Sequence, residues 1–323
     1  MLFKNKRILV FGDIMLDRYI WGDTSRISPE APVPVVEVLR ESCTAGGAAN
    51  VALNLASLGL AVALYGLSGR DAAGDELVSI LSRAGVSYSK ALQIPGFSTV
   101  VKTRVMVRSQ QLCRLDTEPP PEHHCPARHG VVDEVLKAVM SADAVLISDY
   151  AKGIVTQSVL DQILAAVKST GAVSVIDPKP KRKLHFRGAS VMTPNRSEAL
   201  ELAGLLDTGR GSAFPFKQVG TKIFEEYDPS FLVVTLGAEG MALYRSPDDF
   251  TLLPTAAREV YDVSGAGDTV VAVITAALAA GLSIKEAVSI ANIAAGIVVA
   301  KVGTAVVTAS ELSQALPPSL GLI

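Results

Sequence analysis

Short apolar runs alternate with longer amphipathic segments along most of the chain. The apolar runs end in polar or glycine-containing turns and lie at 7–13, 61–69, 143–149, 173–177, 189–195 and 231–237. Val, Ile and Leu dominate these runs with little interruption, which is typical of parallel strands covered on both faces. The pattern therefore predicts a buried, mostly parallel sheet.

The segments between and after these runs predict helices. They lie at 47–58, 73–84, 128–140, 156–170, 197–205, 265–280 and 283–301. Strands that alternate with helices form layered α/β domains, in which the crossovers between parallel strands are right-handed. We therefore expect an α/β fold.

Two stretches do not fit this alternation. Residues 19–41 and 98–116 are rich in β-branched residues and partly alternate between apolar and polar positions, as strands with one exposed face do. We expect them to form a small separate sheet, inserted at about 17–41 and 97–117 into a single domain that spans residues 1–323.

A connector follows the second of these stretches. Proline and charge cluster between residues 116 and 130, which predicts an exposed segment. His123, His124 and Cys125 lie in it, but no second pair of ligands has metal-binding spacing, so we expect no metal site there.

Composition narrows the class of protein. Lys and Arg number 30 against 32 Asp and Glu, so no basic excess indicates a nucleic-acid or membrane partner. The three cysteines are far apart and form no CxxC motif, which is typical of a reducing compartment. The first apolar run is too short for a signal peptide, and the run at 270–282 falls short of the roughly 20 residues of a membrane span. We expect a cytoplasmic protein.

Polar or glycine residues follow most predicted strands at their carboxyl ends. They include Gly12-Asp13, Ser148-Asp149-Tyr150, Asp177-Pro178-Lys179, Thr193-Pro194-Asn195 and Thr235-Leu236-Gly237. In open α/β sheets, ligands bind beyond the carboxyl ends of the strands. These turns are therefore expected to line one cleft.

The stretch DVSGAGDTV, residues 262–270, carries the sharpest chemical signal. Gly265, Ala266 and Gly267 leave the backbone uncovered at the start of a predicted helix, where free N–H groups and the helix dipole favour an anion such as phosphate. Asp268 then lies in the first turn, where it can accept a proton from an attacking hydroxyl. The alternative is a simple helix cap, with Ser264 as the N-cap and Asp268 favouring the dipole.

Four motifs, in order along the chain, resemble those of the ribokinase-like (PfkB) sugar kinases. They are AGGAANVALNLASLG at 45–59, TPNRSE at 193–198, TLGAEG at 235–240 and DVSGAGDTVVAVI at 262–274. The resemblance spans nearly the whole chain. It implies a three-layer ribokinase-like fold, with a mostly parallel central sheet, helices on both faces and a small β lid. It also implies transfer of the γ-phosphoryl group of ATP to a sugar, with Mg²⁺.

Within that family, three further segments resemble the bacterial D-glycero-β-D-manno-heptose-7-phosphate kinases. They lie at 12–38, 108–116 and 148–153. Those kinases are often fused to an adenylyltransferase domain, and this chain resembles the stand-alone form. The resemblance implies phosphorylation of the anomeric hydroxyl of heptose 7-phosphate to the 1,7-bisphosphate, a precursor of ADP-heptose and the lipopolysaccharide core.

Three other functions compete with this interpretation. The chain could be another sugar or nucleoside kinase of the same family, or a non-catalytic sugar-binding regulator, although the intact Asp268 disfavours a regulator. A dinucleotide oxidoreductase would need GxGxxG after the first strand, and VFGDIMLD at 10–17 does not supply it.

The resemblance also implies roles for individual residues. Asp268 would be the catalytic base, and Gly265, Ala266 and Gly267 would donate backbone N–H groups to the transferred phosphoryl group. The expected sugar ligands are Asp13, Asp17, Gly46, Gly47, Asn50 and Asp149. The expected ATP-binding residues are Asn195, Glu198, Thr235, Gly237, Gly240, Asn292 and Gly303.

Two cation sites follow from the same resemblance. Asn195 and Glu198 would hold Mg²⁺ through water, and the same pair could form a helix capping box without excluding that role. Some relatives also bind a monovalent cation, for which Asp262 and Ser264 are the candidates.

The substrate's own phosphate needs a cationic partner. The basic residues near the predicted cleft are Lys102, Arg104, Arg108, Lys152, Lys179, Lys181, Arg182 and Lys183. We expect Arg104 and Lys152 to serve. The small lid sheet would expose an edge if it stood alone, so we also expect a homodimer in which two lids pair.

Overall fold

A nine-stranded sheet forms the centre of the computed structural model, which describes residues 3, 5–108, 110–207, 209, 212–257, 259–301 and 303–317. Its strands follow the order β15-β14-β13-β12-β11-β10-β1-β4-β6. All neighbours are parallel except at one edge, where β13–β14 and β14–β15 are antiparallel. The strands are β1 (Arg7–Gly12), β4 (Ala61–Tyr65), β6 (Ser87–Tyr88), β10 (Ala144–Ser148), β11 (Val173–Asp177), β12 (Val191–Met192), β13 (Phe231–Thr235), β14 (Met241–Tyr244) and β15 (Phe250–Leu253).

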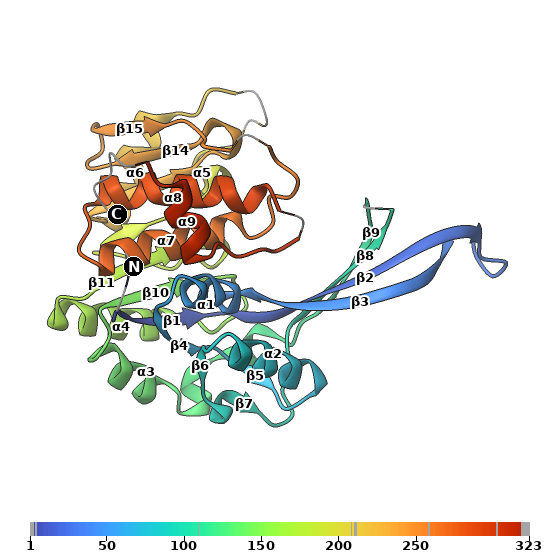
Figure 1. Ribbon diagram of the computed structural model, residues 1–323. Helices are drawn as coiled ribbons and strands as arrows, with labels where there is room; N and C mark the ends of the chain where they lie inside the picture. The colour runs from blue at the N-terminus through green and yellow to red at the C-terminus, as the bar shows by residue number, and fades with distance from the viewer. Residues whose placement is uncertain are drawn as a thin grey trace.

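Helices cover both faces of this sheet (Figure 1). One face packs against α1 (Ala48–Ser57), α2 (Ala72–Arg83), α7 (Ala266–Ala279), α8 (Ile284–Val299) and α9 (Ala309–Ala315). The other face packs against α3 (Val132–Val139), α4 (Gln157–Thr170), α5 (Arg196–Leu202) and α6 (Phe216–Tyr227). The result is the expected three-layer α/β fold. No helix in the described ranges has the length and apolarity that crossing a bilayer would require.

Successive side chains of each central strand enter opposite layers of the core. In β1, Ile8 and Val10 pack with the α1–α7–α8 layer, whereas Leu9 and Phe11 pack with the α3–α4–α6 layer. This follows from the two-residue side-chain period of a strand. Because both faces are buried, the strands are apolar throughout, which explains the uninterrupted runs in the sequence.

A second sheet of four strands, in the order β3-β2-β8-β9, projects from this body (Figure 1). Its strands are β2 (Ile14–Ile27), β3 (Pro34–Gly47), β8 (Val101–Val107) and β9 (Gln110–Thr117). β2 begins two residues after β1 ends, and β3 runs directly into α1. The predicted lid sheet is therefore present, and it is joined at both ends of its long hairpin to the central domain. A short parallel pair, β5 (Ser68–Gly69) with β7 (Gln93–Ile94), completes the strands of the described chain.

The connector at 116–130 differs from the prediction. It forms two 3₁₀ turns, Pro121–His124 and Pro126–His129, and it is not uniformly exposed. His124 is only 3% exposed, its ring packs edge-on against Phe97 with centroids 4.8 Å apart, and burial lowers the pKa of His124. The predicted helix at 128–140 begins only at Val132, because Gly130 adopts a left-handed conformation (φ 67°).

Candidate active site

Asp268 lies in the first turn of α7, and its carboxylate is held by two side chains from distant parts of the chain. Asn50 Nδ2 donates to Oδ2 over 2.6 Å, and the Tyr150 hydroxyl donates to Oδ1 over 2.6 Å. Burial raises the pKa of Asp268 to about 6, although the two hydrogen bonds act in the opposite direction. A carboxyl group with such a pKa can both accept and release a proton near neutral pH.

Tyr150 lies in one of the turns that the sequence predicted to line the cleft, but no role of its own was predicted for it. It follows Asp149 in the turn after β10, so its position beyond a strand's carboxyl end was the available signal. Burial, followed by the charges of Asp268 and Asp177, raises the pKa of Tyr150 well above its usual value. The hydroxyl therefore stays protonated and acts as a donor to Asp268.

Asp13 organises the turn that carries Tyr150. Its carboxylate accepts the main-chain N–H groups of Tyr150 (2.9 Å), Lys152 (3.0 Å) and Ile154 (3.2 Å). Asp13 therefore lies at the predicted cleft, but its carboxylate binds the backbone of this turn. Ala151 has a left-handed conformation (φ 57°), and these hydrogen bonds help to hold that strained backbone.

Two predicted sugar ligands have a buried polar atom with no hydrogen-bond partner among the described residues: Asn50 Oδ1, in the side chain that binds Asp268, and Asp149 Oδ2, in the turn after β10. The other Asp149 oxygen accepts the N–H of Ala151 over 2.8 Å. Burial, with the charge of Asp13, raises the pKa of Asp149 to about 7. Buried polar atoms are nearly always paired in folded proteins, so each of these two atoms is available to a polar ligand.

Gly46 and Gly47 are required by the close packing of the strands at this point. A Cβ atom on Gly46 would lie 2.3 Å from Oδ2 of Asp17. A Cβ on Gly47, which has φ of 60°, would lie 2.4 Å from the Asp13 carbonyl oxygen. The two glycines therefore allow the Asp17 carboxylate and the start of α1 to approach each other.

A cavity of about 400 Å³ lies beside the α7 N-terminus. Six of the predicted ATP-site or anion-site residues line it: Thr235, Gly237, Gly240, Ala266, Gly267 and Asn292. Nothing lies within 4 Å of the position of a Cβ on Gly267, so its backbone faces open space. Asn292 Nδ2 also donates to the Pro254 carbonyl over 2.7 Å.

Three other predicted residues near the α7 N-terminus, Asp262, Ser264 and Gly303, are joined by hydrogen bonds. Gly303 donates its N–H to Asp262 Oδ2 over 3.1 Å, and Ser264 donates its N–H to Asp262 Oδ1 over 2.9 Å. Gly303 is not among the described residues that line the cavity. Both oxygens of Asp262 are therefore bound to the main chain that leads into α7.

Asn195 and Glu198 form a full capping box at the start of α5. Asn195 Oδ1 accepts the Glu198 N–H over 3.0 Å, Glu198 Oε2 accepts the Asn195 N–H over 2.9 Å, and Lys179 pairs with Glu198 Oε1. Burial, with the charges of Glu198 and Asp268, raises the pKa of the neighbouring Asp177 well above its usual value.

This arrangement fits Mg²⁺ bound mainly by water and substrate phosphates. Within the described ranges, no group of three or more His, Cys, Asp or Glu side chains is placed to hold a metal directly. Mg²⁺ commonly keeps several waters and takes only one or two carboxylates from the protein. The carboxyl groups of Asp177 and Glu198 supply hard oxygen donors of that kind.

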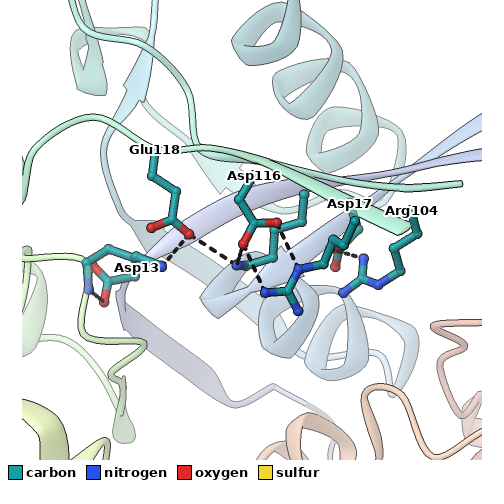
Figure 2. Close-up of polar contacts among 8 residues, drawn as sticks. Asp13, Asp17, Arg104, Asp116 and Glu118 are labelled. Atoms are coloured by element: carbon teal, nitrogen blue, oxygen red, sulfur yellow. Dashed lines mark hydrogen bonds and ion pairs between the residues drawn. The ribbon is translucent and has the colours of Figure 1, made fainter. Parts of the chain in front are cut away.

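Charged side chains cover the face of the lid sheet (Figure 2). Arg104 Nη1 lies 2.5 Å from Asp17 Oδ1. The residue predicted to bind the substrate's phosphate and a predicted sugar ligand therefore bind each other. Lys152 pairs with Glu118, and Lys102 lies 3.2 Å from the same carboxylate. By contrast, Arg108 is largely exposed and pairs with Asp23 further along the hairpin.

Known proteins have similar sequences and a similar fold. Residues 5–310 match the pfkB family carbohydrate kinase domain. The chain is 42% identical over 317 residues to the bifunctional protein HldE of Magnetococcus marinus and 44% identical over 321 residues to that of Pseudomonas fluorescens SBW25. These alignments cover 97% and 99% of the chain but only 64% and 65% of the relatives.

Solved structures agree on the fold. Arabidopsis thaliana ribokinase, complexed with ribose and ATP, superimposes with a TM-score of 0.74 at 20% identity and covers 96% of this chain and 98% of its own. Ribokinase from Giardia lamblia gives a TM-score of 0.76 at 19% identity, over 97% and 100% of the two chains. The four ordered motifs, the three-layer fold and the sequence match together show that the chain belongs to the pfkB family of carbohydrate kinases.

Proposed function

We propose that this chain transfers the γ-phosphoryl group of ATP to the anomeric hydroxyl of D-glycero-β-D-manno-heptose 7-phosphate and so forms the 1,7-bisphosphate. The observation that carries the proposal is the position of Asp268. Its buried carboxylate lies in the first turn of α7, whose N-terminus lines a cavity of about 400 Å³, and it accepts a hydrogen bond from Asn50, whose Oδ1 has no partner among the described residues. The similarity to HldE kinases supports the choice of heptose 7-phosphate.

The reaction follows from this placement. ATP occupies the cavity with its γ-phosphoryl group toward Gly265 and Gly267, where the helix N-terminus stabilises negative charge. The anomeric hydroxyl binds near Asn50 Oδ1 and gives its proton to Asp268. Its oxygen forms a bond to the γ-phosphorus while the bond from that phosphorus to the β-phosphate oxygen breaks, and ADP leaves.

Other residues hold the reactants. Glu198 and Asn195 would hold Mg²⁺ through water, and the ion would neutralise charge on the ATP phosphates when bound. The lid sheet would cover the sugar and exclude water, which could otherwise accept the phosphoryl group. Gly46 and Gly47 bring the backbone close to the sugar hydroxyls.

Replacement of Asp268 by Asn should nearly abolish turnover and leave ATP binding intact. Loss of a general base alone lowers the rate about 10²- to 10⁴-fold. Turnover would be followed by ADP release and ATP affinity by calorimetry. Asp133→Asn removes the same charge from the first turn of α3, at an exposed position, and should be neutral. Near-normal turnover of Asp268→Asn would exclude Asp268 as the base.

Replacement of Tyr150 by Phe should move the acid limb of the kcat–pH profile to higher pH. The wild-type limb is expected near the Asp268 pKa of about 6. Removing the hydroxyl takes away a donor that stabilises the ionised carboxylate, so the pKa of Asp268 should rise by about one unit. Tyr227→Phe, in the buried end of α6, is the matched control. An unchanged acid limb in Tyr150→Phe would contradict this positioning role.

The enzyme should use heptose 7-phosphate much better than unphosphorylated heptose. A phosphate that binds Arg or Lys fixes the reacting oxygen from a distance, and one or two charged hydrogen bonds correspond to about 10- to 100-fold in kcat/KM. Steady-state kinetics with both sugars give this ratio. Equal values would reject the phosphosugar proposal and favour a plain sugar kinase.

We also propose that the lid sheet pairs across a homodimer. Val38 and Leu39 of β3 are 55% and 76% exposed, and a second copy would cover them. Light scattering at micromolar concentration should give twice the chain mass of 33.8 kDa, and Leu39→Asp should lower it. Leu206→Asp, at an 89% exposed position outside the lid, should not. A wild-type protein that is monomeric at this concentration would contradict the proposal.

A further inference from the structure

Two arginines stand directly opposite each other on neighbouring lid strands. Arg104 of β8 pairs in register with Arg114 of β9. Like charges at opposed positions of an antiparallel pair destabilise a sheet. Each arginine is instead neutralised by a carboxylate of the same sheet, Arg104 by Asp17 and Arg114 by Asp116.

Asp116 is bound in the way that arginine and lysine bind a phosphate. Arg114 Nε and Nη2 donate to its two oxygens over 2.8 and 3.0 Å, and Lys102 Nζ donates over 3.3 Å. A two-pronged contact of this kind is also the preferred geometry between arginine and phosphate. Burial alone would raise the pKa of Asp116, but the Arg114 and Lys102 hydrogen bonds hold it below its usual value.

These charged side chains lie on the same face of the lid sheet as Tyr19, which connects them to the start of α7. Arg104 is level with Tyr19 on the adjacent strand and lies over its ring. The Tyr19 hydroxyl is 3.2 Å from Thr304 Oγ1, and Thr304 lies against Gly265. The charged face therefore overlooks the helix N-terminus where the phosphoryl group would be transferred.

The face carries an excess of positive charge. Its cations outnumber its carboxylates by one: Lys102, Arg104, Arg114 and Lys152 stand against Asp17, Asp116 and Glu118 (Figure 2). Three of these cations, Lys102, Arg104 and Lys152, have side chains that are between 14% and 21% exposed. Partly buried cations of this kind favour a multiply charged anion.

We propose that Lys102, Arg104 and Arg114 form the binding site for the substrate's phosphate monoester, and that Asp116 occupies part of this site until the phosphate displaces it. The proposal rests on the proposed phosphosugar kinase activity and names the residues that select for the phosphate. Asp116 keeps the opposed arginines stable in the free enzyme. When the phosphate dianion binds, it accepts the hydrogen bonds that Arg114 and Lys102 donate to Asp116 in the free enzyme. The Asp116 carboxylate then turns to solvent.

The first test measures kcat/KM of two arginine-to-alanine variants with heptose 7-phosphate and with unphosphorylated heptose. Arg114→Ala should lower kcat/KM for heptose 7-phosphate at least tenfold and leave kcat/KM for unphosphorylated heptose within twofold. Arg114 is half exposed, so its removal leaves no cavity. Arg108→Ala removes the same charge from the lid at its exposed pair with Asp23, and should alter neither value.

The outcomes separate this site from the activity itself. If the wild-type enzyme does not prefer the phosphorylated sugar, the proposed activity fails before any variant is compared. If the wild type does prefer it and Arg114→Ala lowers both sugars equally, or neither, the phosphate site is rejected while the proposed activity stands.

The second test addresses the exchange. Calorimetry of heptose 7-phosphate, without ATP, should give a Kd for Asp116→Asn that is at least threefold lower than that of the wild type, because the internal competitor for Arg114 has lost its charge. The same variant should bind unphosphorylated heptose as the wild type does. An unchanged or higher Kd for heptose 7-phosphate would overturn the exchange.

Discussion

The buried carboxylate of Asp268 is the constraint on which the arrangement of the site depends. Removing a carboxylate from water is costly unless donors replace the lost hydration. Here the donors come from Asn50 and Tyr150, which precede Asp268 by 218 and 118 residues along the chain. The start of α1, the turn after β10 and the start of α7 must therefore meet at one point. A second buried bond, from Thr269 Oγ1 to Asn54 Oδ1 over 3.0 Å, holds α1 and α7 in the same relation.

The order of the central sheet makes this meeting possible. β10 lies next to β1, so the turn after β10 comes within reach of Asp13, which directly follows β1. Asp13 then fixes that turn through three main-chain N–H groups. Asp13 therefore acts on Asp268 indirectly, through the position of Tyr150. Asp13 is a predicted sugar ligand because it follows a strand, and the structure adds that its carboxylate also accepts three N–H groups of the protein's own backbone.

The sequence predicted the layers and the motif residues but not the contacts between them. Apolar runs and helical periodicity located β1, β10, α1 and α7 to within a few residues, because these elements are buried on their apolar faces. The amphipathic helix α6 and the antiparallel edge strands β14 and β15 were missed. Polar and apolar residues are mixed in α6 and β15, and β14 is apolar but only four residues long. The roles of Tyr150 and Arg114 were missed for a different reason. Each depends on register or on a turn conformation, such as the left-handed Ala151, which no local pattern of residue types specifies.

Continuity of the backbone links the lid sheet to the residues around the Asp268 carboxylate. β2 starts at Ile14, next to Asp13, and β3 ends at Gly47, three residues before Asn50. Asp17, which holds Arg104, packs so closely on Gly46 that no side chain could stand there. A change at Arg104 therefore acts on a segment that leads rigidly into α1 and the Asn50 amide. Packed sheets transmit such displacements because they have little free volume. An anion bound on the lid strands can thus affect the geometry around Asp268 without touching it, which is how a remote phosphate would improve the alignment of the reacting hydroxyl.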